Sequence, residues 1–270
     1  MAAVREAVVD GLFYPAAPGA LRAQIVDYLS GVDAADDARR APPKVLITPH
    51  AGYEYCGAVA AQAYALLGRR GAHAISRVVM LGPTHRVALD GMAAPRAQAF
   101  ETPLGRVALD CAALASLDEL PQVIRSDRAH EREHSIEVQL PFLQTLLGSG
   151  FTLVPLVVGA AGAEAMAQVL ERLWGGDETL IVISSDFSHY LPYEQAQAAD
   201  RATAQRILAL AATLSPQEAC GASAINGALL AARRHGLVPR LLDLRNSGDT
   251  AGDRDRVVGY GAIAFEDRQR

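Results

Sequence analysis

The chain has 270 residues, of which 50% are hydrophobic and 20% charged, and its formal net charge is -5. The acidic balance and the lack of a dense Lys/Arg cluster argue against nucleic acid or an anionic membrane as a partner. The first residues lack the basic segment and apolar core of a signal peptide, and no apolar run reaches the roughly 20 residues that cross a bilayer. Three cysteines without a close pairing pattern are typical of thiols in a reducing compartment, so we expect a cytoplasmic protein.

Apolar periodicity and turn residues predict helices alternating with strands. Residues 11–15 form a turn-rich segment, residues 31–43 a surface loop, and Ser215-Pro216-Gln217-Glu218 resembles a helix start. The predicted helices cover residues 18–29, 52–67, 133–147, 163–173, 193–211 and 222–234. Two predicted strands end at Thr48 and near Leu81, and three more cover residues 151–158, 180–184 and 257–265. Short strands and turns are predicted over residues 91–107.

The predicted strands are continuous β-branched and apolar runs, which is typical of strands buried on both faces of a sheet. Their alternation with helices predicts an α/β fold with a central, mostly parallel or mixed sheet and helices on both of its faces. The chain contains no internal repeat, low-complexity tract or convincing linker. Residues 1–270 are therefore predicted to form a single domain.

Three histidines follow three of these strands. His50 comes after the run that ends at Thr48, His85 after the run that ends at Leu81, and His189 after the run over 180–184. In α/β folds, ligands bind beyond the carboxyl ends of the strands. Imidazole is suited both to metal ligation and to proton transfer near neutral pH. Each histidine alone could be an ordinary loop residue, but three in equivalent places predict one site. Asp186, three residues before His189, suits an orienting carboxylate for a general base.

Cys220 precedes the predicted helix over residues 222–234. Near a helix N-terminus a thiolate is favoured, which suits a nucleophile or a metal ligand. The alternative is a small buried cysteine among alanines. Cys56 and Cys111 lack such a setting and are expected to be packing residues.

The segment His130-Glu131-Arg132-Glu133-His134 matches the HExxH motif of zinc peptidases. That motif requires both histidines on one helix, with a third ligand downstream. The polar flank before His130 is more typical of a loop leading into a helix, and no obvious third ligand follows. A zinc hydrolase built on His130 and Glu131 is therefore the weakest of the functional hypotheses.

Several of these segments together resemble the Memo family, whose prokaryotic members are called AmmeMemoRadiSam system protein B. The resemblance covers nearly the whole chain in the same order. The segments that carry it are Gly11-x-Phe13-Tyr14-Pro15, Pro49-His50-Ala51-Gly52-Tyr53, Gly82-Pro83-x-His85, Glu133-His134-Ser135-Ile136-Glu137-x-Gln139-Leu140-Pro141, Ser185-Asp186-x-Ser188-His189-Tyr190, Cys220-Gly221 and Ser247-Gly248-Asp249.

The Memo family is similar in fold to the LigB-type extradiol dioxygenases, which are non-haem iron enzymes. The resemblance implies that His50, His85 and Cys220 are metal ligands. It also implies that His189 is an acid/base residue, with His134 and Asp186 in the same pocket. A thiolate would then stand where a facial triad has a carboxylate, and such a site could hold Fe(II), Cu(I) or Zn(II). The resemblance makes Fe(II) the first expectation, with Cu and Zn as the alternatives. Catechol cleavage does not follow from the shared fold.

The leading hypothesis from the sequence is a metal-dependent, dioxygenase-like oxidoreductase that acts on a small aromatic or otherwise chelating substrate. The alternative is a non-catalytic module that captures a peptide or protein partner in the same pocket, as Memo-like proteins have also been described as signalling modules. The name of the prokaryotic members further implies a partner that is a radical SAM protein. The sequence predicts neither the substrate nor the oligomeric state.

Overall fold

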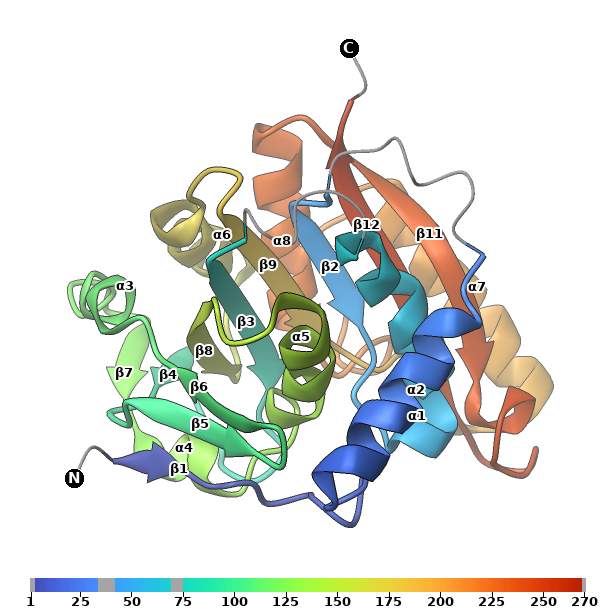
Figure 1. The fold of residues 1–270 in the computed structure, drawn as a ribbon. Coiled ribbons are helices and arrows are strands. Elements are labelled where there is room, and N and C mark those ends of the chain that lie inside the picture. Colours follow the sequence, from blue (N-terminus) through green and yellow to red (C-terminus); the bar gives the residue numbers. More distant parts are fainter. Residues whose placement is uncertain (1–2, 34–41, 69–74, 269–270) are drawn as a thin grey trace.

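A nine-stranded mixed sheet forms the centre of the computed structural model, which describes residues 3–33, 42–68 and 75–268 (Figure 1). Its four inner strands are parallel and lie in the order β2 (Val45–Thr48), β9 (Thr179–Ser184), β3 (Arg77–Pro83) and β8 (Thr152–Val158). Beyond β2 lie β12 (Val257–Asp267), β11 (Leu237–Asn246) and β10 (His189–Leu191), and beyond β8 lie β4 (Met92–Ala94) and β7 (Val123–Arg125). Antiparallel pairing of β12 with β2 and of β4 with β8 makes the sheet mixed.

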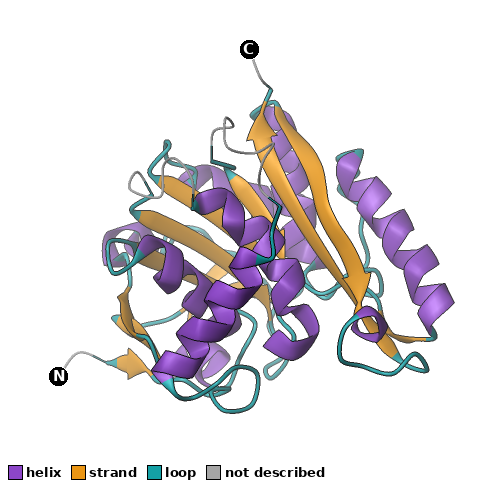
Figure 2. Cartoon of the chain, turned by 45° about the vertical axis from the view of Figure 1, so that its right-hand side comes forward, coloured by secondary structure: helices purple, strands orange, loops and turns teal. Residues whose placement is uncertain are grey.

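Helices cover both faces of this sheet (Figure 2). On one face lie α1 (Pro18–Ser30), α2 (Tyr53–Tyr64) and α5 (Leu140–Leu147), and on the other lie α6 (Ala163–Leu173), α7 (Tyr193–Leu208) and α8 (Ala222–Arg234). Shorter elements of the described residues are α3 (Cys111–Ala115), α4 (Asp127–Glu131), the 3-10 turns η2 (Ala65–Leu67), η3 (Glu137–Gln139) and η4 (Ser247–Asp249), and a small sheet of β1 (Val4–Arg5), β5 (Ala99–Thr102) and β6 (Gly105–Ala108). The predicted α/β architecture is confirmed.

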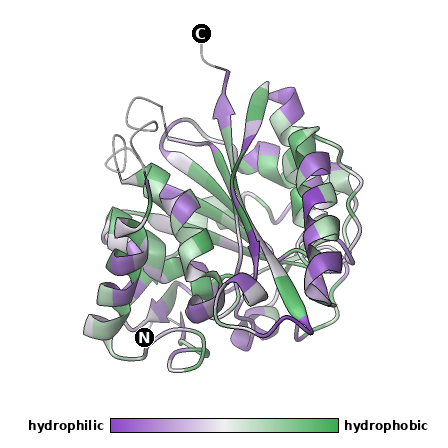
Figure 3. Ribbon diagram, turned by 90° about the vertical axis from the view of Figure 1, so that its right-hand side faces the viewer, coloured by the Kyte–Doolittle hydropathy of each residue, from purple (hydrophilic) through white to green (hydrophobic). Residues whose placement is uncertain are grey.

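The inner strands are buried on both faces, as their unbroken apolar runs predict. Val78, Val79 and Leu81 of β3, and Ile181 and Ile183 of β9, have no exposed surface. Figure 3 shows these mostly hydrophobic strands between helices whose hydrophilic residues are concentrated on the outside. Each fully buried aliphatic side chain contributes about 1.5–3 kcal/mol relative to exposure, so the sheet is a rigid base for the loops at its edge.

The predicted helix over residues 133–147 was wrong in its first turn. Residues 132–136 are not helical, and the regular helix begins only at Leu140 after the 3-10 turn η3. The reason is local, because the Glu133 carboxylate accepts hydrogen bonds from the backbone N–H groups of His134 and Ser135. Pro141 lies in the first turn of α5, where its missing N–H does no harm.

Two other predictions need correction. The residues around Ser215 form a hydrogen-bonded turn rather than a helix, since the backbone N–H of Cys220 donates to the carbonyl of Asp186 and the helix starts afresh at Ala222. Strand β11 was missed because Pro239 and several charges interrupt its apolar pattern. Of the predicted loop over 31–43, residues 34–41 lie outside the described part of the chain. Among the described residues, no helix has the length and apolar character needed to cross a membrane.

Candidate metal centre

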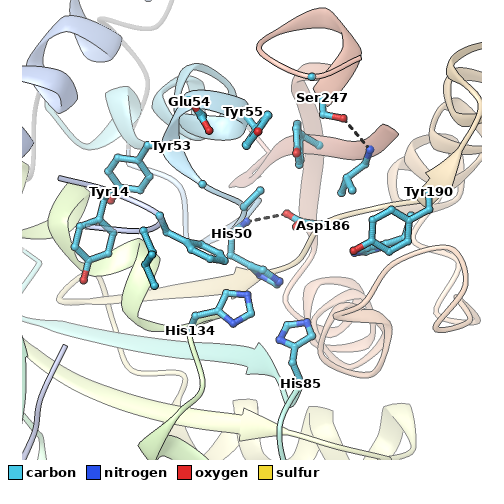
Figure 4. Close-up of a pocket in the computed structure, with 18 of the residues that line it drawn as sticks. Tyr14, His50, Tyr53, Glu54, Tyr55, His85, His134, Asp186, Tyr190 and Ser247 are labelled. Atoms are coloured by element: carbon cyan, nitrogen blue, oxygen red, sulfur yellow. Dashed lines mark hydrogen bonds between the residues drawn. The ribbon is translucent and has the colours of Figure 1, made fainter. Parts of the chain in front are cut away.

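A cavity of about 830 Å³ lies beyond the carboxyl ends of the parallel strands (Figure 4). His50 follows β2, His85 follows β3 and Asp186 follows β9, and these are three neighbouring strands of the sheet. The cavity wall includes His50, His85, His134, Asp186, His189 and Tyr190. The prediction that the strand-end histidines reach one edge of the sheet is therefore confirmed for their placement.

Three histidines converge at the inner end of this cavity. His50, His85 and His134 each offer a ring nitrogen, and these three nitrogens lie within 4.8 Å of one another. The ring centroids of His50 and His85 are 5.2 Å apart, and those of His85 and His134 are 4.8 Å apart. Neutral imidazole nitrogens at such spacing could hold one metal ion. The sequence anticipated His50 and His85 as ligands, whereas the cluster takes His134, from the segment before α5, as its third member.

The hydrogen bonds of Ser184 fix the tautomer of His50. The Ser184 hydroxyl donates its only proton to the backbone carbonyl of Ser135 (2.5 Å) and accepts from Nε2 of Gln139 (2.7 Å). Nδ1 of His50 lies 2.9 Å from the same oxygen, so Nδ1 must be the donor there. Nε2 of His50 is left with a free lone pair. Burial, reinforced by the neighbouring imidazoles of His85 and His134, lowers the pKa of His50 well below its usual value and keeps the ring neutral.

Glu133 orients His85 in a similar way. One carboxylate oxygen lies 2.9 Å from Nδ1 of His85, and the other accepts the backbone N–H of His85 at 2.5 Å. Burial alone would raise the pKa of Glu133, but the hydrogen bonds from His85 and the amide of Ser135 outweigh it and hold the pKa at about 2. An ionised carboxylate on Nδ1 directs the lone pair to Nε2, as carboxylate–histidine pairs do beside metals.

Gly82 allows the segment that carries Glu133 and His134 to lie close to the end of β3. A Cβ atom at Gly82 would lie 2.5 Å from Oγ of Ser135, so a larger residue would push the segment that carries Glu133 and His134 away from the end of β3. His134 itself lies between Phe13 and His85, with its ring centroid 4.8 Å from each. Its buried Nδ1 has no hydrogen-bond partner, although it is 3.3 Å from the Glu133 carboxylate. Burial lowers the pKa of His134 to about 4.

Cys220 lies beside His50, two residues before α8. Its Sγ is 3.4 Å from Nε2 of His50 and 3.3 Å from the backbone nitrogen of Asp186. Burial, together with the negative charge of Asp186, raises the pKa of Cys220 to about 12. The thiol is therefore protonated and points at the free lone pair of His50. This position is compatible with the predicted role of Cys220 as a ligand, which stays a prediction.

Asp186 and His189, the other two predicted site residues, also line the cavity. An oxygen of Asp186 accepts the backbone N–H of His50 at 2.8 Å, and burial raises the pKa of Asp186 to about 7. His189 begins β10, and burial lowers its pKa as well. Asp186 can therefore exchange a proton near neutral pH, while His189 is held neutral. The predicted roles, His189 as the acid/base residue and Asp186 as its orienting carboxylate, stay predictions.

The HExxH match does not form a peptidase site. Helix α4 ends at Glu131, so His130 and His134 are not on one helix. His130 is buried, and its Nε2 is 2.9 Å from the carbonyl of Ala93. Only His134 reaches the cavity, which removes the geometric basis of the zinc hydrolase hypothesis.

Sequence reasoning missed the groups that orient the candidate ligands. Glu133 is 2% exposed and carries four hydrogen bonds at the site, and Ser184 and Gln139 set the tautomer of His50. The position of Glu133 directly before His134 in the motif was the available signal. Ser184 and Gln139 gave no signal, because nothing local distinguishes them from other polar residues in the core.

Comparison with known proteins supports the resemblance seen in the motifs. The profile of the Memo-like protein family matches residues 5–264. A MEMO1 family protein of Methanopyrus kandleri is 36% identical over 97% of this chain and 98% of its own length. One of Sulfolobus acidocaldarius is 34% identical over 98% of this chain and 100% of its own length, and one of Aeropyrum pernix is 38% identical over 80% and 81%. This chain therefore belongs to the Memo-like protein family.

Proposed function

We propose that this protein binds one transition-metal ion between His50 and His85 and acts as an oxidoreductase on a small chelating ligand in the cavity, in the cytoplasm. The observation that carries the proposal is the fixed tautomer of both rings. Ser184 engages Nδ1 of His50 and Glu133 engages Nδ1 of His85, so each ring keeps an Nε2 lone pair for a metal. Iron(II) is our first choice of metal, with copper and zinc as the alternatives.

The third ligand is Cys220 or His134. Cys220 adjoins Nε2 of His50, whereas His134 shares the cluster with both other rings and has an Nδ1 without a hydrogen bond. A thiolate and two imidazoles form a soft donor set that suits iron(II), copper(I) or zinc, and three imidazoles also suit copper and zinc. We favour Cys220, with His134 in contact with the bound ligand.

A redox-active ion held by three protein ligands would supply electron transfer to, or oxygen chemistry on, a ligand in its open coordination positions. The chain's own residues would position that ligand and handle protons. Asp186 holds the loop after β2 through the backbone N–H of His50 and can accept a proton near neutral pH. His189, neutral and on the cavity wall, can take a proton from a hydroxyl group of the ligand.

Elemental analysis of anaerobically purified protein tests the metal proposal. We expect close to one iron or copper per chain in the wild type, and almost none in His50→Ala and His85→Ala. His130→Gln is the matched control, because it removes a buried histidine bonded to the Ala93 carbonyl and should retain the metal. A metal-free wild type that resists reconstitution, or equal metal content in all four proteins, would refute the proposal.

A second candidate function has one observation in its favour. Leu12 and Tyr190 line the same cavity with 79% and 61% of their surface exposed, which suits capture of a peptide or of a protein partner such as a radical SAM enzyme. A pure binding module would bind its partner equally well after chelation and would consume no oxygen. Dependence of partner binding on the metal would favour the enzyme.

A further inference from the structure

Tyr190 has a backbone conformation that its residue type disfavours. Its φ is 59°, in the left-handed region where non-glycine residues are uncommon and bulky ones are outliers. Among the described non-glycine residues, only Leu210 shares a positive φ, at 55°. An outlier of this kind persists where the surrounding structure enforces it, and it points to function when glycine would serve the same structural purpose without strain.

The conformation of Leu210 has a structural reason. Leu210 follows the last turn of α7, and its N–H donates to the carbonyl of Ile207 while that of Ala211 donates to the carbonyl of Arg206. This pair of bonds is the Schellman motif, which ends many helices with one left-handed residue. Tyr190 lies in the short strand β10 and ends no helix.

Tyr190 is the extra residue of a β-bulge. His189 pairs with Val258 and Leu191 with Val257, so two steps along β10 match one step along β12. A left-handed residue in such a bulge is usually glycine. In a regular strand, successive side chains point to opposite faces. The bulge breaks this alternation, and the neighbouring side chains of His189 and Tyr190 both line the cavity.

The side chain of Tyr190 gains little from burial, since 61% of the residue is exposed. Its ring meets that of His189 edge-on at 5.9 Å, and the guanidinium of Arg256 lies 5.1 Å from its centroid. Figure 4 shows its hydroxyl end turned toward Asp186 and the histidines. A tyrosine is thus held in a glycine conformation with its polar end turned toward the candidate metal centre.

We propose that Tyr190 is a ligand-contacting residue whose bulge holds the phenol over the cavity, where it packs against a planar small molecule and hydrogen-bonds a polar group on it. The proposal rests on the proposed function, because the ligand must lie between Tyr190 and the histidine cluster. It adds the class of ligand, planar with a hydrogen-bonding edge, and the residue that selects it.

Two substitutions that both remove the side chain test the strain. Tyr190→Gly suits the left-handed backbone and Tyr190→Ala does not, so the Gly variant should melt about 2 °C or more above the Ala variant and no lower than wild type. Val238, 41% exposed in β11, is the control position, where Val238→Gly should melt below Val238→Ala. A Tyr190→Gly variant less stable than Tyr190→Ala would overturn the strain argument.

Ligand contact is tested with 4-nitrocatechol, a planar chelating probe with a visible absorption band, titrated into metal-loaded and metal-free protein. We expect Tyr190→Gly and Tyr190→Ala to bind it at least about tenfold more weakly than wild type, and Tyr190→Phe to lie between, with metal content unchanged. Equal affinity of wild type and Tyr190→Gly would overturn the proposal. If metal-loaded and metal-free protein bind 4-nitrocatechol equally well but Tyr190→Gly still binds it more weakly, the proposed metal function is refuted and the role of Tyr190 stands.

Discussion

Two buried glutamates four residues apart, Glu133 and Glu137, lie in the segment between α4 and α5 and bond different partners. Glu133 is 2% exposed and bonds His85, which lines the cavity, and the amides of His134 and Ser135. Glu137 is fully buried. It bonds the guanidinium of Arg5.

The other partners of Glu137 all belong to the N-terminal segment. Its carboxylate accepts the backbone N–H groups of Val8 and Val9 at 3.0 Å and the hydroxyl of Tyr14 at 2.5 Å. The two carboxylates therefore share residue type, burial and sequence context but differ in function. Glu133 orients a candidate ligand, whereas Glu137 attaches the N-terminal segment to the domain. Burial alone therefore does not show that an acidic residue has a functional role. The groups to which its carboxylate bonds identify that role.

The largest effect should follow from Glu137→Gln. The amide leaves the Arg5 guanidinium without its buried counter-charge, and removing one partner of such a pair costs about 3–5 kcal/mol. We expect that loss in the free energy of unfolding of metal-free protein, measured by urea denaturation. Metal affinity should change less than about threefold. A loss of less than about 1 kcal/mol would show that Glu137 is not the anchor of the N-terminal segment.

Glu133→Gln makes the identical chemical change at the carboxylate that bonds His85. A neutral amide cannot accept from both the backbone N–H and Nδ1 of His85, so the ring loses its fixed tautomer. Loss of such an outer partner lowers metal affinity by about 10–100-fold. Competition with a chelator of known affinity measures it. If Glu133→Gln and Glu137→Gln weaken metal binding equally, the contrast between the two carboxylates is wrong.

Much of the fold could be predicted from the sequence, because buried parallel strands have unbroken apolar runs that local patterns reveal. The runs ending at Thr48 and Ser184 were placed correctly, and so were His50 and His85 at the ends of their strands. Strand β11 was missed for a physical reason. Among the described strands it pairs with β12 alone, and an edge position tolerates Pro239 and the charges at positions 240, 243 and 245 that an inner strand would exclude.

The candidate site was less predictable, because its details depend on contacts between distant segments. The helical periodicity of residues 133–147 was real, but Glu133 takes up the amides that would start the helix, and this moves His134 into the cavity. The positive φ of Tyr190 arises from pairing with β12, some 67 residues away in the chain, which no local pattern encodes.

The smallest predicted effect separates the two candidate third ligands. The pKa of Cys220 is about 12, whereas burial holds the pKa values of His50 and His134 below their usual range. Between about pH 7.5 and 9, a metal bound by Cys220 must therefore displace the thiol proton. A lower pH supplies the competing proton and weakens metal binding. Metal affinity should therefore increase about tenfold for each unit by which the pH is raised, and one proton should be released for each metal ion bound. Ligation by His50, His85 and His134 predicts no such slope.

Metal titrations at several pH values, with proton release followed in weak buffer, measure this slope. Cys220→Ser should abolish both the slope and the released proton, while Cys111→Ser, at an exposed thiol, should leave them unchanged. A wild-type slope near zero would make His134 the third ligand. Glu133 would then contact two of the metal ligands, because its carboxylate lies 2.9 Å from Nδ1 of His85 and 3.3 Å from Nδ1 of His134. In that case Glu133→Gln should weaken metal binding at the upper end of its expected range, because one substitution would disturb two of the three ligands.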